Sequence, residues 1–279
     1  MKVSVLLDNN TLIDRYFFGE PGVSFYIEDN GKKILFDTGY SDAFVRNAEK
    51  MCIDLRQLDH IVLSHGHVDH SWGLTYLARM YMEAKIEDVP HTQPSIIAHP
   101  AVWESKKFGD MGEIGSLFSE QKIQMHFATH TSIEPVWLTE NLVFLGEIPR
   151  HFEFEGKEVI GTVSRNGEET DDFVIDDTAL AYRSPNGLVI IVGCAHSGIC
   201  NIVEYAKQVC GDERIIDIIG GFHLQHPSKE QMEQTVEYMK GLRLPVMHPC
   251  HCTDFSSKVA LTRAASIQEV GVGLRLQYE

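Results

Sequence analysis

Six consecutive residues at 65–70, His-Gly-His-Val-Asp-His, constrain this chain more than any other segment. They follow the apolar run 61–63, which is typical of a buried strand, and they precede a segment with the apolar spacing of a helix. Imidazole groups suit borderline metals such as zinc, and a carboxylate among them can hold a second ion or orient a water. A solvated polar turn would not need three histidines. The segment therefore predicts a metal site at the end of a strand.

Three distant histidines occupy comparable positions, because His196, His223 and His251 each come directly after an apolar, strand-like run. Ligands recur at the carboxyl ends of neighbouring strands when a site is built along one edge of a sheet. We therefore expect His196 and His251 to bind metal. His223 is equally suited to be a ligand, a hydrogen-bond donor to the substrate or a packed residue. Asp37 ends a strand in a tight turn, where it is better placed to orient a ligand histidine than to bind metal itself.

Cysteines flank two of these histidines, at Cys194, Cys250 and Cys252. Thiolates bind zinc well, but Cys-His-Cys over three residues is not a zinc-finger spacing, and cysteine is often a small buried apolar residue. The pattern favours packing over direct ligation. The six cysteines as a set lack the spacing of a disulfide-stapled scaffold, which predicts reduced thiols and a cytoplasmic protein.

Charge and hydropathy exclude several classes of partner. The formal net charge of -16 would repel phosphate backbones and anionic lipids, so we expect a small-molecule substrate and neither nucleic acid nor membrane as partner. No segment approaches the roughly 20 consecutive apolar residues that span a bilayer, and the N-terminal apolar run predicts a first strand and not a secretory signal. The oligomeric state is left open.

The order of the predicted elements indicates an α/β protein of two similar halves. Each half has a strand-rich portion followed by alternating strands and helices, without a linker-like composition between them. We therefore predict one domain over residues 1–279, with helices outside two central sheets. The glycine-containing segment 104–125 is expected to be a long loop, either a lid that shapes the pocket or a variable surface excursion. Other expected elements include helices at 42–56, 199–210 and 257–269 and a closing strand at 271–278.

The segment 65–70, preceded by Asp37-Thr38-Gly39, resembles the signature of the metallo-β-lactamase superfamily. The resemblance extends over nearly the whole chain, and it implies the αββα sandwich of that superfamily. Further segments resemble one subgroup, the metal-dependent hydrolases similar to dihydropterin-methyl-(ribofuranosyl)aminobenzene-phosphate synthase. These segments are 146–150, 177–180, 193–196, 220–224 and 249–253.

The resemblance also implies two divalent metal ions held by two sets of three ligands, with zinc expected and iron or manganese as alternatives. The implied sets are His65, His67 and His196 for one ion and Asp69, His70 and His251 for the other. The chain departs from the superfamily pattern at one place. Many members have Gly-Asp after the strand equivalent to 188–192, and that Asp bridges the metals, whereas this chain has Gly193-Cys194. The bridge is therefore Cys194, Asp177 or only water.

The favoured hypothesis is metal-assisted hydrolysis of a small, anionic ester or phosphoester. Asp69 would orient the attacking water and accept its proton, and His223 would stabilise the developing oxyanion. The start of the helix after His196 would add a positive dipole end that favours a phosphate. Three alternatives are bond formation of the dihydropterin-synthase type, iron-dependent redox chemistry and a non-catalytic metal-binding sensor. Redox members of the superfamily typically carry Glu where His67 stands, so this residue favours hydrolysis.

Overall fold

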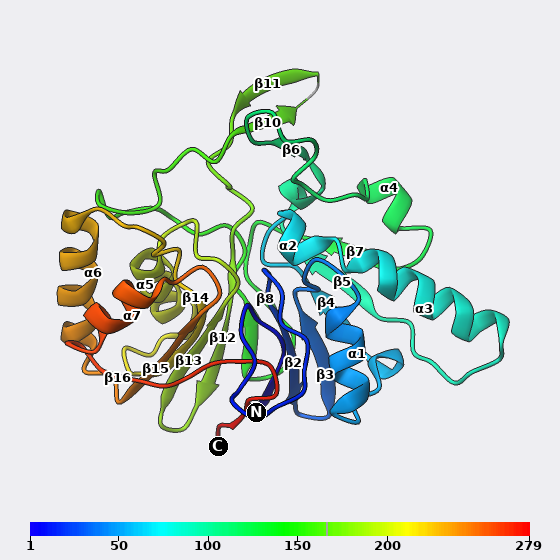
Figure 1. Ribbon diagram of the computed structural model, residues 1–279, viewed down its shortest axis with the longest axis horizontal. Helices are drawn as coiled ribbons and strands as arrows, with labels where there is room; N and C mark the ends of the chain where they lie inside the picture. The colour runs from blue at the N-terminus through cyan, green and yellow to red at the C-terminus, as the bar shows by residue number, and fades with distance from the viewer. Residues whose placement is uncertain (166) are drawn as a thin grey trace.

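Two seven-stranded β-sheets stand face to face in the computed structural model, which describes residues 1–165 and 167–279 (Figure 1). The first sheet contains, in spatial order, β17 (Arg275–Gln277), β1 (Lys2–Leu7), β2 (Ser24–Asp29), β3 (Lys32–Phe36), β4 (His60–Val62), β5 (Ser95–Ala98) and β7 (Ala128–Thr131). The second contains β16 (Ser266–Ile267), β15 (Val246–Cys250), β14 (Ile215–Gly221), β13 (Gly187–Val192), β12 (Ala179–Ser184), β9 (Leu142–Phe144) and β8 (Val136–Trp137). A third, small sheet contains β11 (Glu168–Asp171), β10 (Thr162–Arg165) and β6 (Ser105–Lys107).

Helices cover the outer face of each large sheet (Figure 1). Those of the first half are α1 (Ala43–Lys50), η1 (Leu55–Gln57), α2 (Val68–Ser71), α3 (Leu74–Ile86), η2 (Pro100–Trp103) and α4 (Glu120–Ile123). Those of the second half are α5 (Ile199–Cys210), α6 (Lys229–Leu242) and α7 (Phe255–Leu261). Among the described residues, no helix combines the length and the apolar character needed to cross a membrane.

Three hydrophobic cores hold these layers together. One lies between the two sheets, where Phe25 and Phe36 of the first half and Phe144 and Ile191 of the second are fully buried. The second core joins the first sheet to α1 and α3, and the third joins the second sheet to α5 and α6. The predicted order of helix, sheet, sheet and helix is confirmed.

The strand directions bring the candidate ligands together. Strands β3, β4 and β5 run parallel in the first sheet, and β13, β14 and β15 run parallel in the second. Their carboxyl ends lie at the end of the sandwich from which the small sheet projects, opposite the two chain termini (Figure 1). The segment 65–70 and the three distant histidines follow these strands, so one edge collects them all.

Several predicted boundaries were wrong for local reasons. The helix expected at 42–56 ends at Lys50, because Cys52 adopts a left-handed backbone with φ 59°. The helix expected at 257–269 is the shorter α7, and the strand expected at 271–278 is only the three residues of β17.

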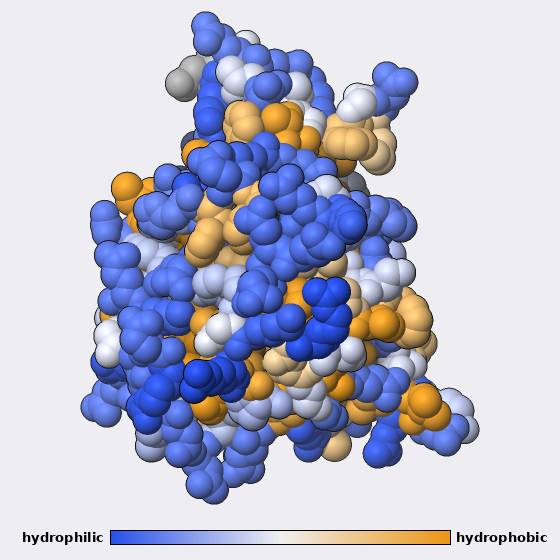
Figure 2. Space-filling view, turned by 90° about the vertical axis from the view of Figure 1, so that its left-hand side faces the viewer, coloured by the Kyte–Doolittle hydropathy of each residue, from blue (hydrophilic) through white to orange (hydrophobic). Residues whose placement is uncertain are grey.

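The segment 104–125 is also less irregular than expected, since it contains β6 and α4. Strand β6 pairs with β10, which gives the small sheet its third strand. Seen from the side that carries α6, this sheet stands above the body with a mostly hydrophilic surface (Figure 2). Its role as a lid stays a prediction.

Gly193, directly after β13, lies close to residues of the first half. A Cβ added there would lie 2.1 Å from Ser64 Oγ and 2.8 Å from Asp37 Oδ2. We expect Gly193→Ala to lower the free energy of unfolding by about 1–3 kcal/mol in urea titrations, because the added methyl group overpacks this contact. Gly241→Ala is the control, since nothing lies within 4 Å of a Cβ built there. Equal stability of the two variants would contradict the close approach.

Candidate metal centre

The segment 65–70 is held in place by one buried carboxylate. Asp37 follows β3 with φ 59°, and its side chain accepts hydrogen bonds from the backbone N–H of Ser64 at 2.7 Å and from Ser64 Oγ at 2.6 Å. Asp37 Oδ2 also lies 2.7 Å from Nδ1 of His70. These contacts confirm the prediction that Asp37 orients a histidine.

The first predicted ligand set is brought together. His65 Nε2 lies 3.0 Å from His67 Nδ1, and the ring centroid of His196 lies 4.8 Å from that of His65 and 4.9 Å from that of His67. Nε2 of His67 and both ring nitrogens of His196 are buried without a hydrogen-bond partner among the described residues. A buried nitrogen without a hydrogen-bond partner destabilises the folded state, and a metal ion would give these nitrogens a partner. The space that they surround therefore fits a metal ion.

The second predicted set also converges. Nε2 of His70 lies 3.2 Å from Nε2 of His251, and the Asp69 carboxylate lies 3.4 Å from the same nitrogen of His251 and 3.8 Å from that of His70. Behind His251, the Asn9 side-chain oxygen lies 3.0 Å from Nδ1 and Asp8 accepts the backbone N–H. The polar atoms of this set therefore also fit a cation.

Burial controls the protonation of these histidines. It holds the pKa of His65 and His196 well below the usual value and lowers that of His67 to about 3, because a charged imidazole is poorly solvated there. Neutral imidazole is the form that binds metal. Burial acts in the same direction on His70, but the carboxylates of Asp69 and Asp37 outweigh it and raise its pKa to about 9.

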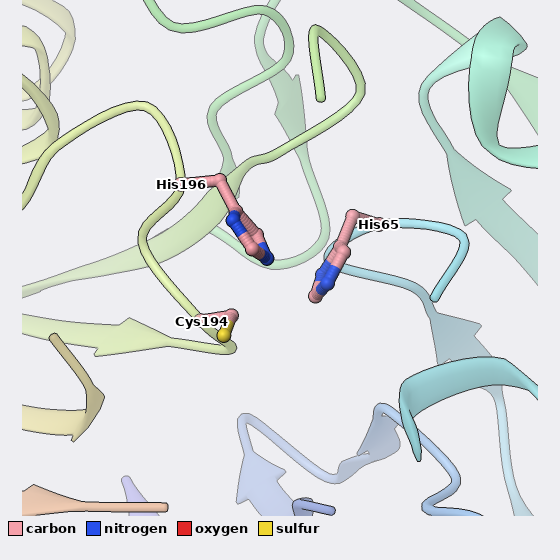
Figure 3. A group of neighbouring side chains, drawn as sticks. All are labelled: His65, Cys194 and His196. Atoms are coloured by element: carbon pink, nitrogen blue, oxygen red, sulfur yellow. The ribbon is translucent and has the colours of Figure 1, made fainter. Parts of the chain in front are cut away.

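Cys194 occupies the position between the two sets. Figure 3 shows Cys194 beside His65 and His196, and its Sγ belongs to each of three groups of side chains that could hold a metal. Cys194 is therefore a candidate metal ligand and not only a packed core residue. Cys250, in contrast, is buried in the core between the sheets, as expected. The carboxylate of Asp177 instead accepts hydrogen bonds from the backbone N–H and Oγ of Ser197.

A hollow of about 310 Å³ adjoins His196 and His223. Its lining includes three acidic residues, and one of them, Glu158, lies 3.4 Å from Nε2 of His223. A second, Glu155, accepts the backbone N–H groups of Cys200 and Asn201 at the start of α5. The expectation that this helix start favours a phosphate was therefore wrong, because an internal carboxylate already occupies it.

A buried lysine connects the small sheet to the segment 65–70 through two aspartates. Lys106 of β6 is only 1% exposed, and its Nζ lies 2.6 Å from Asp176 and 3.1 Å from Asp172. Asp176 in turn accepts the backbone N–H of Gly66, between the first two histidines of the segment. Sequence reasoning missed these residues, because nothing in the local pattern distinguishes Lys106 from a surface lysine. Asp8 was detectable, since it follows an apolar strand as Asp37 does.

Comparison with known proteins identifies the family. A family model described as the metallo-beta-lactamase superfamily matches residues 18–251, which include both ligand sets. The chain belongs to this superfamily. The resemblance based on the segment 65–70 is therefore confirmed, and membership supports an enzyme with a divalent-metal site.

Relatives of this superfamily member carry different functional names. The 7,8-dihydropterin-6-methyl-4-(beta-D-ribofuranosyl)-aminobenzene-5'-phosphate synthase of Methanocaldococcus jannaschii is 30% identical over 271 residues, which cover 92% of this chain and 89% of the relative. An uncharacterised protein of the same organism is 31% identical over 265 residues, which cover 94% of each chain. The crystal structure of Tm1679, described as a metal-dependent hydrolase of the beta-lactamase superfamily, matches with a TM-score of 0.83 and 30% identity over 99% of this chain and 98% of that one.

Replacing Asp37 with Asn keeps the side-chain shape but removes the charge that orients His70. We expect Asp37→Asn to weaken metal binding about 10–100-fold in chelator competition, as is usual for an acceptor behind a ligand histidine. The matched control is Asp217→Asn, because Asp217 is also buried and lies 2.9 Å from a histidine, His248, outside both ligand sets. An equal loss of affinity in the two variants would contradict the role of Asp37.

The free energy of unfolding should depend on pH partly through the titration of Glu155. Burial raises its pKa from 4.5 to about 7. The folded protein therefore keeps a proton that the unfolded chain releases, so this group's contribution to stability is lost as the pH rises from about 4.5 to about 7. Urea unfolding across this range should show a smaller decline for Glu155→Gln, whose side chain does not titrate. Identical profiles for the variant and the wild type would contradict the assignment.

Proposed function

We propose that this protein is a metal-dependent hydrolase that cleaves a small ester or phosphoester. The convergence of two ligand sets, together with the unpaired buried ring nitrogens of His67 and His196 in the first set, carries this proposal. Two divalent ions, zinc foremost, would lower the pKa of a bound water and polarise an oxygen of the substrate. The proposed ligands are His65, His67 and His196 for one ion and Asp69, His70 and His251 for the other.

Two side chains, Asp69 and His223, are proposed to act on the substrate. The Asp69 side chain is 30% exposed, so its carboxylate can orient a water and accept a proton while it lies beside His70 and His251. His223 lines the hollow, and we assign its imidazole the role of stabilising an oxygen on which negative charge develops. Since Glu155 fills the start of α5, an anionic group of the substrate must instead face the ligand histidines.

Sequence similarity favours a second candidate. One relative that is 30% identical is named as a synthase, so bond formation that yields a dihydropterin-linked ribofuranosyl aminobenzene phosphate is the alternative reaction. Mass spectrometry of reactions containing ribofuranosylaminobenzene 5'-phosphate and a 7,8-dihydropterin that carries a leaving group on its 6-methyl carbon would detect that product and the released group. Product formation without any turnover of esters or phosphoesters would replace the hydrolase proposal with this one.

Elemental analysis combined with a panel of carboxyl esters, phosphomonoesters, phosphodiesters and diphosphates tests the favoured function. We expect His67→Ala to lose bound metal and activity together, because one ligand of the first set is removed. Asp69→Asn should lower kcat by about 10²–10⁴-fold, the usual effect of removing an acid–base group.

His248→Ala provides a matched control, because His248 is also buried but pairs with Asp217 away from the ligand sets. It should retain both metal and turnover. Full metal content and full activity in His67→Ala would refute the hydrolase proposal. Iron as the bound metal, with colour in the purified protein, would favour the redox alternative.

A further inference from the structure

A third cluster of ligand-type side chains lies beside the two sets. Cys252 Sγ lies 3.0 Å from Cys194 Sγ, and Nδ1 of His223 lies 3.6 Å from Cys194 Sγ. The ligand atoms of all three residues lie within 4.8 Å of one another. They follow β13, β14 and β15, three adjacent parallel strands, so the sheet itself sets their separation.

The orientation of His223 matches that of a metal ligand. Its Nε2 faces the carboxylate of Glu158, which leaves Nδ1 directed at the sulfur atoms. Three other histidines show the same division: His65 between Ser64 and the site, His70 between Asp37 and the site, and His251 between Asn9 and the site. A ligand histidine usually gives its second nitrogen to an oxygen acceptor in this way. His223 holds this orientation with a left-handed backbone, φ 49°.

The backbone also accommodates the sulfur of Cys252. The backbone N–H of His223 donates to Cys252 Sγ at 3.2 Å. A Cβ added to Gly221 would lie 2.6 Å from the same sulfur, so only glycine leaves room for it there. Hydrogen bonds from the backbone to sulfur are a feature of metal–thiolate centres.

We propose that Cys194, Cys252 and His223 form a thiolate-rich site for a borderline divalent ion such as zinc. Two sulfurs and one imidazole are a donor set that zinc favours, and three protein ligands leave a fourth position open. Cys194 Sγ also groups with His65 and His196, so this site adjoins the histidine sets. The site goes beyond the proposed hydrolysis, because it requires no substrate and no assigned reaction.

Cobalt(II) is the probe for this site, because thiolate ligands give it a charge-transfer absorption in the near ultraviolet that histidine and carboxylate ligands do not. Metal-free, reduced protein titrated with Co²⁺ should develop this absorption. Cys252→Ser should lower it to roughly half per bound ion, since one of two thiolates is lost. Cys210→Ser is the control and should leave it unchanged, because Cys210 is buried in α5 away from the cluster.

Cys252→Asp separates the loss of a sulfur ligand from a failure to fold. It should retain the cobalt stoichiometry, because a carboxylate is also a ligand, but lose the same share of the absorption. An absorption that Cys252→Ser leaves intact, or no absorption in the wild type, would overturn the proposal. A Cys194–Cys252 disulfide in protein that keeps its full metal content would also overturn it. None of these readouts depends on hydrolysis, so the two proposals can fail separately.

Discussion

The arrangement of this site depends on the hydrogen bonds that Asp37 accepts. Its carboxylate is fully buried and would be strongly destabilising without partners, so Ser64 and His70 are fixed by the need to satisfy it. Ser64 Oγ in turn lies 2.9 Å from Nδ1 of His65. Gly193 of the second half packs against the same atoms. One carboxylate therefore positions ligands of the first half and sets how closely the second half approaches.

The convergence of the candidate ligand histidines could be predicted from sequence because they obey a local rule. His196 and His251 follow apolar strands, and parallel strands place their carboxyl ends along one edge. Residues whose role depends on contacts between distant segments could not be found in this way. Lys106 meets Asp176 across 70 residues, and Glu155 meets Asn201 across 46. Helix ends were missed where a single residue such as Cys52 adopts a left-handed backbone.

The charges around the site favour the binding of a cation. The chain carries a net charge of -16, and acidic side chains stand on both sides of the ligand atoms, with Asp69 among them and Glu158 at the edge of the hollow. The positive charge of Lys106 is already neutralised by Asp172 and Asp176. The imidazoles of His65 and His196 are held neutral by burial, so they add no competing charge. Bound cations would thus meet repulsion mainly from His70, whose pKa of about 9 keeps its imidazole protonated near neutral pH until a metal displaces the proton.

The proposed ligands come from both halves of the chain, and this has a consequence for how the protein would bind metal after synthesis. His70 and His251 are 181 residues apart, yet their nitrogens lie side by side. During synthesis the nascent chain displays the segment 65–70 long before the second half exists. Only a partial ligand set is available in that interval, and a partial set binds metal weakly and with little selectivity. Metal acquisition would therefore be a late event that follows the docking of the two halves, and it would lock that docking in place.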